Sequence, residues 1–255
     1  MRIELEVVSV QKAGHAPSEN EDAWASERSS TLEGDTLRVA VADGATESLF
    51  SGQWARLLAR EYVAGKMGEP PALLESLPGL QRRWRSDTET RELPWYAQEK
   101  LREGAFATLL GVRCAQSPRP GQGVGTWTAL VVGDSCLFQV REGRLVCAFP
   151  LEQAAAFGSR PFLVSTHEGH NSRVGDFVRR ASGDLRPGDL LLLMTDALAQ
   201  WFLAEHERGG TPWLALPAWG SEAPHERFQP FVDGLRASKV IRNDDVTLAR
   251  LTVGA

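Results

Sequence analysis

The sequence predicts a single domain of the mixed α+β class, built on antiparallel sheets and spanning residues 1–255. Strand-like segments lie at both ends of the chain, with helical segments between them. In the middle of the chain, three short strand-like segments follow one another without a helix, which favours an antiparallel meander over βαβ units. We find no internal repeat, low-complexity tract or clean linker in the chain.

Each element of the first half follows from a local pattern. Charged and apolar residues alternate over residues 1–10, which predicts a half-buried strand. A second, more apolar strand is predicted over residues 36–42 and stops abruptly at an Asp-Gly pair. Ser51 is the predicted N-cap of a helix over residues 51–64, because apolar residues then recur at three- and four-residue spacing.

The rest of the chain is interpreted in the same way. Four prolines between residues 67 and 94 predict a short helix with irregular joins. Residues 151–188 are polar and give no clear element, and residues 206–224 are expected to form a surface flap. The remaining predictions are helices over 95–102, 197–205 and 226–238, and strands over 106–114, 127–133, 135–140, 145–149, 190–195 and 246–251.

Composition excludes several classes of function. The 28 basic residues against 33 acidic ones give a net charge of −5, so we expect no nucleic-acid partner. The three cysteines share no CxxC spacing, which argues against a disulfide framework or a zinc site. Acidic residues stand where a signal peptide needs an apolar stretch, and no apolar run approaches the ~20 residues of a membrane span. We therefore expect a cytoplasmic protein without a membrane partner.

Acidic residues mark the places where predicted strands end or begin. Asp43 and Asp196 each follow directly after an apolar strand, Glu21 and Asp22 end a polar loop, and Asp244 stands just before the last strand. Any one of these could be a turn residue or a helix cap, as Asp commonly is. As a set, with no basic residue directly beside them, they would repel one another unless a cation neutralised them.

Oxygen-only ligation favours hard cations, Mg²⁺ or Mn²⁺, over zinc. Two such ions about 3.5–4 Å apart would share a water molecule, lower its pKa and stabilise an in-line displacement. If the acids converge, hydrolysis of a phosphate ester is the chemistry that fits them.

Six short motifs, in order along the chain, resemble one known family, the metal-dependent protein serine/threonine phosphatases of type 2C in their bacterial branch. The motifs are Asn20-Glu21-Asp22-Ala23, Val41-Ala42-Asp43-Gly44-Ala45, residues 104–110, Val132-Gly133-Asp134-Ser135, Thr195-Asp196-Ala197-Leu198 and Asn243-Asp244-Asp245-Val246-Thr247. The resemblance implies a four-layer α-β-β-α sandwich, in which two antiparallel sheets are flanked by helices on both faces.

The resemblance also implies a role for each acidic residue. Asp43 would bridge two Mn²⁺ or Mg²⁺ ions, and the carbonyl of Gly44 would bind one of them. Asp22 would bind one ion, and Asp196 and Asp244 the other. In the same way, Glu21 would hold a metal-bound water, Asp134 would secure a turn, and Asp245, which stands where the family usually has Asn, would be a weaker candidate ligand than Asp244.

Three positions depart from the family pattern. Pro17 stands where many members carry a phosphate-binding Arg, and Lys12 or His15 are the substitutes that we consider. Ala45 replaces a His that follows the Asp-Gly pair in some members. Gln200 replaces an Asp that serves a third metal, so a third site is weakened or absent.

The resemblance predicts a phosphatase that acts on phosphoserine and phosphothreonine in proteins, with a metal-bridging hydroxide as nucleophile. A phosphorylated protein is the expected partner, and a cognate serine/threonine kinase is a further candidate. We expect a monomer. Two alternatives stay open: a pseudophosphatase that binds phosphoproteins without hydrolysis, and a hydrolase of small phosphate esters.

Overall fold

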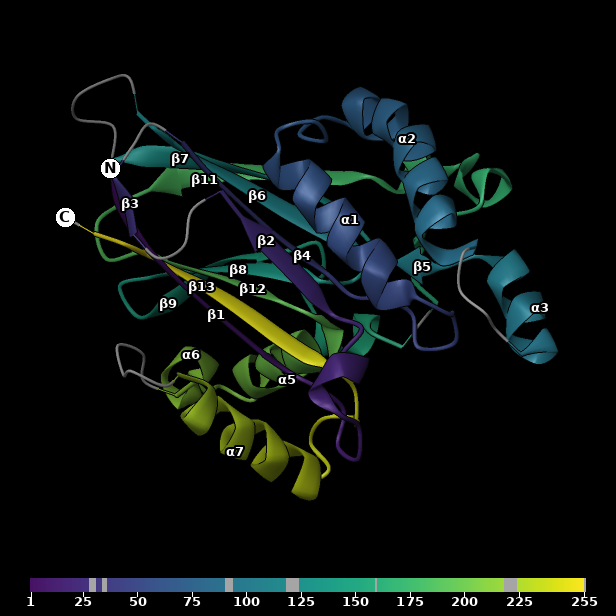
Figure 1. Cartoon of the computed structure of the whole chain (residues 1–255). Coiled ribbons are helices and arrows are strands. Elements are labelled where there is room, and N and C mark those ends of the chain that lie inside the picture. The colour runs from purple at the N-terminus through teal and green to yellow at the C-terminus, as the bar shows by residue number, and fades with distance from the viewer. Residues whose placement is uncertain are drawn as a thin grey trace.

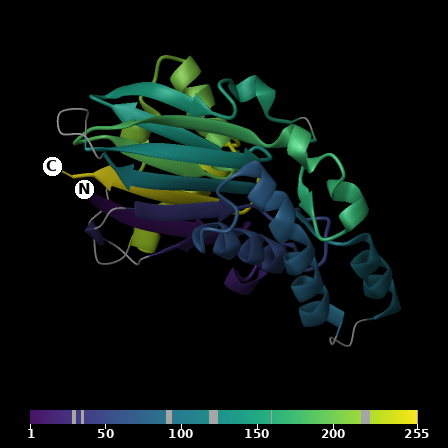
Figure 2. The same cartoon turned by 90° about the horizontal axis from the view of Figure 1, so that it is seen from above.

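Two antiparallel sheets lie face to face, with helices on both outer faces (Figures 1 and 2). The computed structural model describes residues 1–27, 31–33, 36–89, 94–117, 124–158, 160–217 and 224–254. This arrangement confirms the predicted α+β sandwich. Within the described ranges, no helix is both long enough and apolar enough to cross a membrane.

The first sheet joins the two ends of the chain. Its strand order is β3 (Thr31–Glu33), β1 (Arg2–Val10), β13 (Val246–Val253), β12 (Leu190–Met194), β8 (Cys136–Arg141) and β9 (Arg144–Phe149). The antiparallel register places Val10 opposite Val246 and Met194 opposite Leu248. The ends of β1 and β12 therefore lie beside the start of β13.

The second sheet has the order β11 (Arg179–Leu185), β7 (Gly125–Val132), β6 (Leu109–Gln116), β4 (Thr36–Ala42) and β2 (Ala23–Ser26). Alternation along β4 shows how it is packed. Val39 and Val41 belong to the core between the sheets, while Ala40 and Ala42 face the helices outside. A strand buried on both faces reads as a continuous apolar run, as residues 39–42 at the end of β4 do.

Helices cover each outer face of the sandwich. α1 (Ser51–Val63), α2 (Pro70–Glu89) and α3 (Trp95–Glu103) lie on the side of the second sheet, and α5 (Asp196–Glu207), α6 (Pro212–Ala215) and α7 (Pro224–Ala237) lie on the side of the first (Figure 1). Shorter elements are η1 (Pro17–Glu19), η2 (Ala154–Ala156), η3 (Glu168–Asn171), α4 (Val174–Phe177) and the paired strands β5 (Phe106–Ala107) and β10 (Val164–Ser165).

Three predictions about strands need correction. The predicted meander is wrong, because β7 and β8 lie in different sheets and the turn at Gly133 carries the chain from one to the other. The predicted strand over 106–114 is divided into β5 and β6 at Thr108, which turns towards Asp43. The polar segment 151–188 contains β11, an edge strand whose charged residues face solvent and hide its pattern.

The helix predictions also change in detail. α2 is one continuous helix that contains Pro78, where a short helix with irregular joins was predicted. Ser51 is the first residue of α1 and not its cap, because Phe50 takes the cap position in the left-handed conformation (φ 58°). In the predicted surface flap, Trp213 of α6 packs into the core. Parts of the predicted flap and of the loop near residue 120 fall outside the described residues.

A buried polar network ties the two sheets together at the end of the sandwich where β12 begins. Trp127 of β7 donates to Gln139 of β8 (2.9 Å), and Gln139 donates to Asp189 (2.9 Å). Asp189 is fully buried and accepts two further bonds from Arg141, at 2.8 and 2.7 Å. Its charge is therefore compensated, which makes Asp189 a structural carboxylate.

Asp189→Asn should lower the free energy of unfolding by about 3 kcal/mol, because it removes the buried charge that pairs with Arg141 and leaves only the half-exposed Asp184 as its ionic partner. Urea unfolding, followed by circular dichroism, measures this. An unchanged unfolding midpoint would contradict the structural role that we assign to Asp189.

Candidate metal centre

The predicted acidic residues come together at the other end of the sandwich. Asp22 precedes β2, Asp43 follows β4, Asp196 opens α5 directly after β12, and Asp244 stands two residues before β13. The charges of Asp22 and Asp244 both act on Asp43. Because strands from both sheets end here, residues far apart in sequence meet at one place.

Threonine hydroxyls fix Asp22. The Thr195 hydroxyl donates to Asp22 Oδ2 (3.0 Å) and accepts the backbone N–H of Thr247 (2.9 Å). The side chain of Asn20 accepts the backbone N–H of Asp22 at 2.9 Å. Asp22 is thus connected to the start of α5 and to β13, although it lies beside neither in sequence.

Thr108 fixes Asp43 in a similar way. Its hydroxyl accepts the backbone N–H of Asp43 (2.9 Å), and its own N–H donates to the Asp43 carbonyl (2.8 Å). The same hydroxyl bonds to that of Ser135 at 2.8 Å. Because the chain leaves the strand between β5 and β6, the hydroxyl and the backbone N–H of Thr108 can both bond to the turn that carries Asp43.

Backbones pack closely around Gly44. A Cβ atom there would lie 2.7 Å from the carbonyl carbon of Ser51 and 2.8 Å from the carbonyl oxygen of Glu21. A Cβ atom at Gly52 would likewise lie 2.9 Å from the Cα of Glu21. Only glycine fits at these two positions, so the Asp-Gly turn, the start of α1 and the loop before β2 form one rigid edge of the site.

Glu21 lies at the side of this cluster. Its Oε1 accepts the Ser51 hydroxyl (2.5 Å), and its Oε2 accepts Lys12 Nζ (3.1 Å). Both carboxylate oxygens are thus occupied by the protein. This is consistent with a position outside the group of direct ligands.

Two basic side chains of the chain itself lie among the acids. Lys12 is buried and contacts Glu21, Thr46 and, at 3.6 Å, Asp244. Arg242 forms an ion pair with Asp196, and its Nε lies 3.4 Å from Asp244. The two differ in exposure, since the side chain of Lys12 is 8% exposed and that of Arg242 is 45% exposed.

Asp245 has a structural place. Its Oδ1 accepts the backbone N–H of Lys12 and its Oδ2 that of Glu21, both at 2.8 Å. Because both oxygens are used, Asp245 holds the end of β1 and the loop before β2 together. The sequence motif indicates only a weak candidate ligand at Asp245 and gives no sign of this role.

Burial dominates the electrostatics of the acids. It raises the pKa of Asp22 to about 8, helped by the charges of Asp245 and Asp244 and opposed by the threonine hydroxyls. Burial, followed by the charges of Asp22, Asp244 and Asp134, raises the pKa of Asp43 well above its usual range. Burial also raises the pKa of Asp134. Because its charge acts on Asp43, Asp134 belongs to the cluster electrostatically.

Two observations decide whether the cluster suits a metal ion. Among the described residues, Asp22 Oδ1 and Asp196 Oδ1 are buried and have no hydrogen-bond partner. A buried carboxylate oxygen without a donor is costly and is the kind of oxygen that a cation satisfies. Within the described ranges, no three acidic, histidine or cysteine side chains already stand in coordination geometry. Lys12 and Arg242 contact the acids instead. The donor set is all oxygen and fits Mn²⁺ or Mg²⁺.

Hollows flank the cluster on two sides. One, of 580 Å³, lies beside Glu21 and is lined by the η1 loop, residues 46–53 and Lys100. The other, of 330 Å³, lies beside Asp134 and reaches Arg160 and Arg179. The hollows border the cluster through Glu21 and Asp134, and neither is lined by Asp22, Asp43, Asp196 or Asp244.

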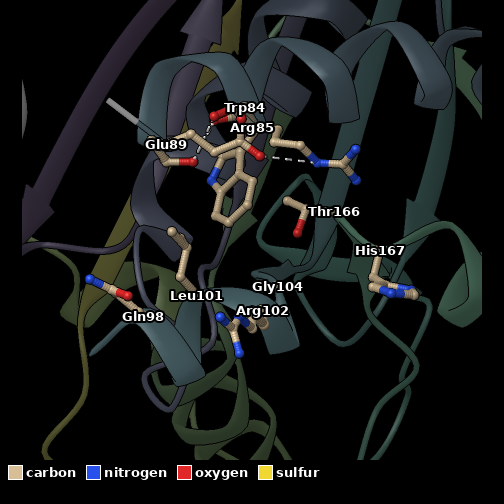
Figure 3. A pocket seen from close by; sticks show the side chains of 10 residues that line it. Trp84, Arg85, Glu89, Gln98, Leu101, Arg102, Gly104, Thr166 and His167 are labelled. Atoms are coloured by element: carbon tan, nitrogen blue, oxygen red, sulfur yellow. Dashed lines mark hydrogen bonds and ion pairs between the residues drawn. The ribbon is translucent and has the colours of Figure 1, made fainter. Parts of the chain in front are cut away.

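A further hollow of 550 Å³ lies between α2, α3 and the segment after β10. Figure 3 shows Trp84 and Arg85 from α2 above it, Leu101 and Arg102 from α3 below it, and Thr166 at its side. None of the predicted acids lines it. It is therefore separate from the candidate metal centre.

The structure shows the surroundings of the three residues that depart from the family pattern. Pro17 heads the exposed turn η1 and offers no donor, Ala45 donates its backbone N–H to Phe106, and Gln200 lies one turn into α5. Arg242 was not singled out in the sequence. Its only signal was its position two residues before Asp244.

Comparison with known proteins agrees with this architecture. The protein phosphatase 2C family matches residues 12–233. The serine/threonine phosphatase PstP of Mycobacterium tuberculosis is 16% identical, with a TM-score of 0.62 over 100% of both chains. The serine/threonine phosphatase of S. agalactiae is 16% identical, with a TM-score of 0.58 over 98% of this chain and 99% of that one.

A second structure, of the PstP catalytic domain in complex with two manganese ions, is also 16% identical, with a TM-score of 0.57 over 99% of this chain and 100% of that one. At this identity the structural matches establish the fold alone. Comparison with curated protein sequences gives no significant match. The family match covers most of the chain, and the chain therefore belongs to the protein phosphatase 2C family of metal-dependent serine/threonine phosphatases.

Proposed function

We propose that the acid cluster is the catalytic centre and removes phosphate from phosphoserine and phosphothreonine in proteins. The observation that carries this is the pair of buried carboxylate oxygens, one of Asp22 and one of Asp196, that have no hydrogen-bond partner among the described residues. A pseudophosphatase would have no evident use for so many acids gathered in one place. The hollows beside Glu21 and Asp134 offer room for the polypeptide that flanks a phosphorylated residue, which favours a protein over a small ester.

Each site residue has a proposed task. Asp43 and the Gly44 carbonyl would bind metal at the rigid turn after β4, with Asp22 on one ion and Asp196 and Asp244 on the other. Glu21, held by Ser51 and Lys12, would orient solvent beside them. When bound, two Mn²⁺ or Mg²⁺ ions would polarise the phosphoryl group and activate a water molecule for in-line attack. The PstP structure with two manganese ions supports this choice of metal.

We also propose that residues 1–255 act as one domain, which the pairing of β1 with β13 supports. A cytoplasmic signalling role, a monomeric state, a cognate serine/threonine kinase and the absence of a nucleic-acid partner are further parts of the proposal. They rest on composition and on the family.

The first test is hydrolysis of a phosphothreonine peptide with Mn²⁺ and then with excess EDTA. We expect turnover with Mn²⁺ and none with EDTA, because the acids need a cation to bind a phosphate dianion. Sugar phosphates and nucleotides should be poorer substrates than the peptide. Correctly folded protein that is inactive with saturating Mn²⁺ would overturn the proposal in favour of the pseudophosphatase.

Asp43→Asn should lower kcat/KM by at least about a hundredfold, since even the partners of metal ligands are worth 10–100-fold. The metal-free variant should melt at a higher temperature than the metal-free wild type, because one of several buried like charges is gone. Mn²⁺ should stabilise the variant less than it stabilises the wild type. Differential scanning fluorimetry with and without Mn²⁺ reads both effects, and wild-type turnover in the variant would refute the assignment.

The neighbours Asp244 and Asp245 provide a matched pair. Asp244→Asn should weaken Mn²⁺ binding, because it removes a proposed ligand. Asp245→Asn should instead lower thermal stability, at a cost of about 1–3 kcal/mol, because one backbone N–H loses its acceptor. Parallel calorimetry and melting curves measure both. Equal loss of Mn²⁺ affinity in the two variants would mean that the roles are assigned wrongly.

A further inference from the structure

The proposed centre lacks an obvious group to bind the substrate phosphate. Carboxylates repel a phosphate dianion, and phosphate recognition in proteins commonly uses cationic donors, with the arginine fork as the bidentate one. From the sequence, Lys12 and His15 are the candidates for this task. The structure allows the basic groups around the acids to be compared directly.

Lys12 is poorly suited to receive a phosphate. It is 7% exposed, and its ammonium contacts Glu21, Thr46 and Asp244. An ammonium has three donors, and three acceptors already surround this one. Lys12 therefore serves to hold Glu21 and its neighbours in place. His15 lies on the exposed loop before η1, beside the hollow next to Glu21.

Arg242 differs from Lys12 in each respect. Its guanidinium faces Asp196 and Asp244, and its charge also reaches Asp43 and Asp134. Its side chain is 45% exposed, so one side of the group is open to solvent. Its ion pairs involve Nη2 and Nε, and a guanidinium has five N–H donors, so the fork has donors to spare.

The backbone around Arg242 is held on both sides. Ile241 is buried in the core cluster beneath α5 and α7. Asn243 accepts the backbone N–H of Ala13 (2.8 Å) and donates to its carbonyl (3.2 Å). The side chain of Arg242 can therefore change partners while its base stays at the edge of the acid cluster.

The ion pairs of Arg242 are open to exchange from the arginine side, since its side chain is 45% exposed while that of Asp196 is 10% exposed. A divalent ion on Asp196 and Asp244 carries twice the charge of the guanidinium and would displace it from the two carboxylates. The displaced group would remain next to the place where a phosphoryl oxygen must lie, between the bound ions and solvent.

We propose that Arg242 is the phosphate-binding side chain of this enzyme: it neutralises Asp196 and Asp244 in the metal-free protein and binds the substrate phosphate once metal ions occupy these acids. The inference rests on the proposed function, because it assigns the recognition of phosphate at the same centre. In the metal-free protein, Arg242 would thus supply part of the positive charge that the metal ions supply when they are bound.

The test compares the wild type with Arg242→Ala, Arg242→Lys and the exposed control Arg208→Ala, which lies at the far end of α5 and pairs with Glu205. Isothermal titration calorimetry with inorganic phosphate, on the Mn²⁺-loaded proteins, is the main measurement. Arg242→Ala should weaken phosphate binding about tenfold or more, since bonds to charged groups are lost. Arg242→Lys should lie between, and Arg208→Ala should match the wild type.

Titration with Mn²⁺ alone gives a second readout. Arg242→Ala should bind Mn²⁺ as tightly as the wild type or tighter, by up to roughly fivefold, because a competing half-exposed cation is removed. With a phosphopeptide, KM should rise more than kcat falls. A merely structural role for Arg242 would instead weaken Mn²⁺ binding and lower the melting temperature.

Unchanged phosphate affinity in Arg242→Ala, or weaker Mn²⁺ binding, would overturn the inference. If the wild type hydrolyses no phosphopeptide but Arg242→Ala still weakens phosphate binding, the proposed function fails and the inference stands. If the wild type hydrolyses the peptide and the variant binds phosphate equally well, the inference fails alone.

Discussion

Repulsion between buried carboxylates is the constraint on which the rest of the structure depends. Asp22, Asp43 and Asp244 act on one another at a place where burial alone already raises the pKa of Asp22 and Asp43. Two carboxylate oxygens there have no partner in the described chain. Such a cluster needs positive charge, and the chain supplies part of it through Lys12 and Arg242. The remainder is what a divalent cation would provide.

At this end of the sandwich, hydrogen bonds between segments hold the acids together against that repulsion. Two of the acids are tied to a segment other than their own: Asp22 to Thr195, and the backbone of Asp43 to Thr108. Asp245 clamps two loops with both of its oxygens. At the opposite end Asp189 is fully buried and fully paired, and it therefore stabilises the fold. Aspartate thus has a structural role at one end of the sandwich and a proposed metal-binding role at the other.

Local patterns were enough to predict most strands and the acids that follow them. The apolar runs before Asp43 and Asp196 lie in one segment each, so their ends can be located without knowing the fold. Sheet membership is different, because alternation does not tell which sheet a strand joins. For this reason the meander prediction was wrong at Gly133, and the polar edge strand β11 was missed. The resemblance to a family supplied the sandwich.

The role of Arg242 could not be predicted for a related reason: its place among the acids depends on the packing of Ile241 and on the tie between Asn243 and Ala13. The most direct test of the whole account is a crystal structure with Mn²⁺, using the anomalous signal of manganese. We predict two peaks among Asp22, Asp43, Asp196 and Asp244, with Arg242 displaced from Asp196. An absence of peaks at saturating Mn²⁺, with Arg242 still on Asp196, would contradict it.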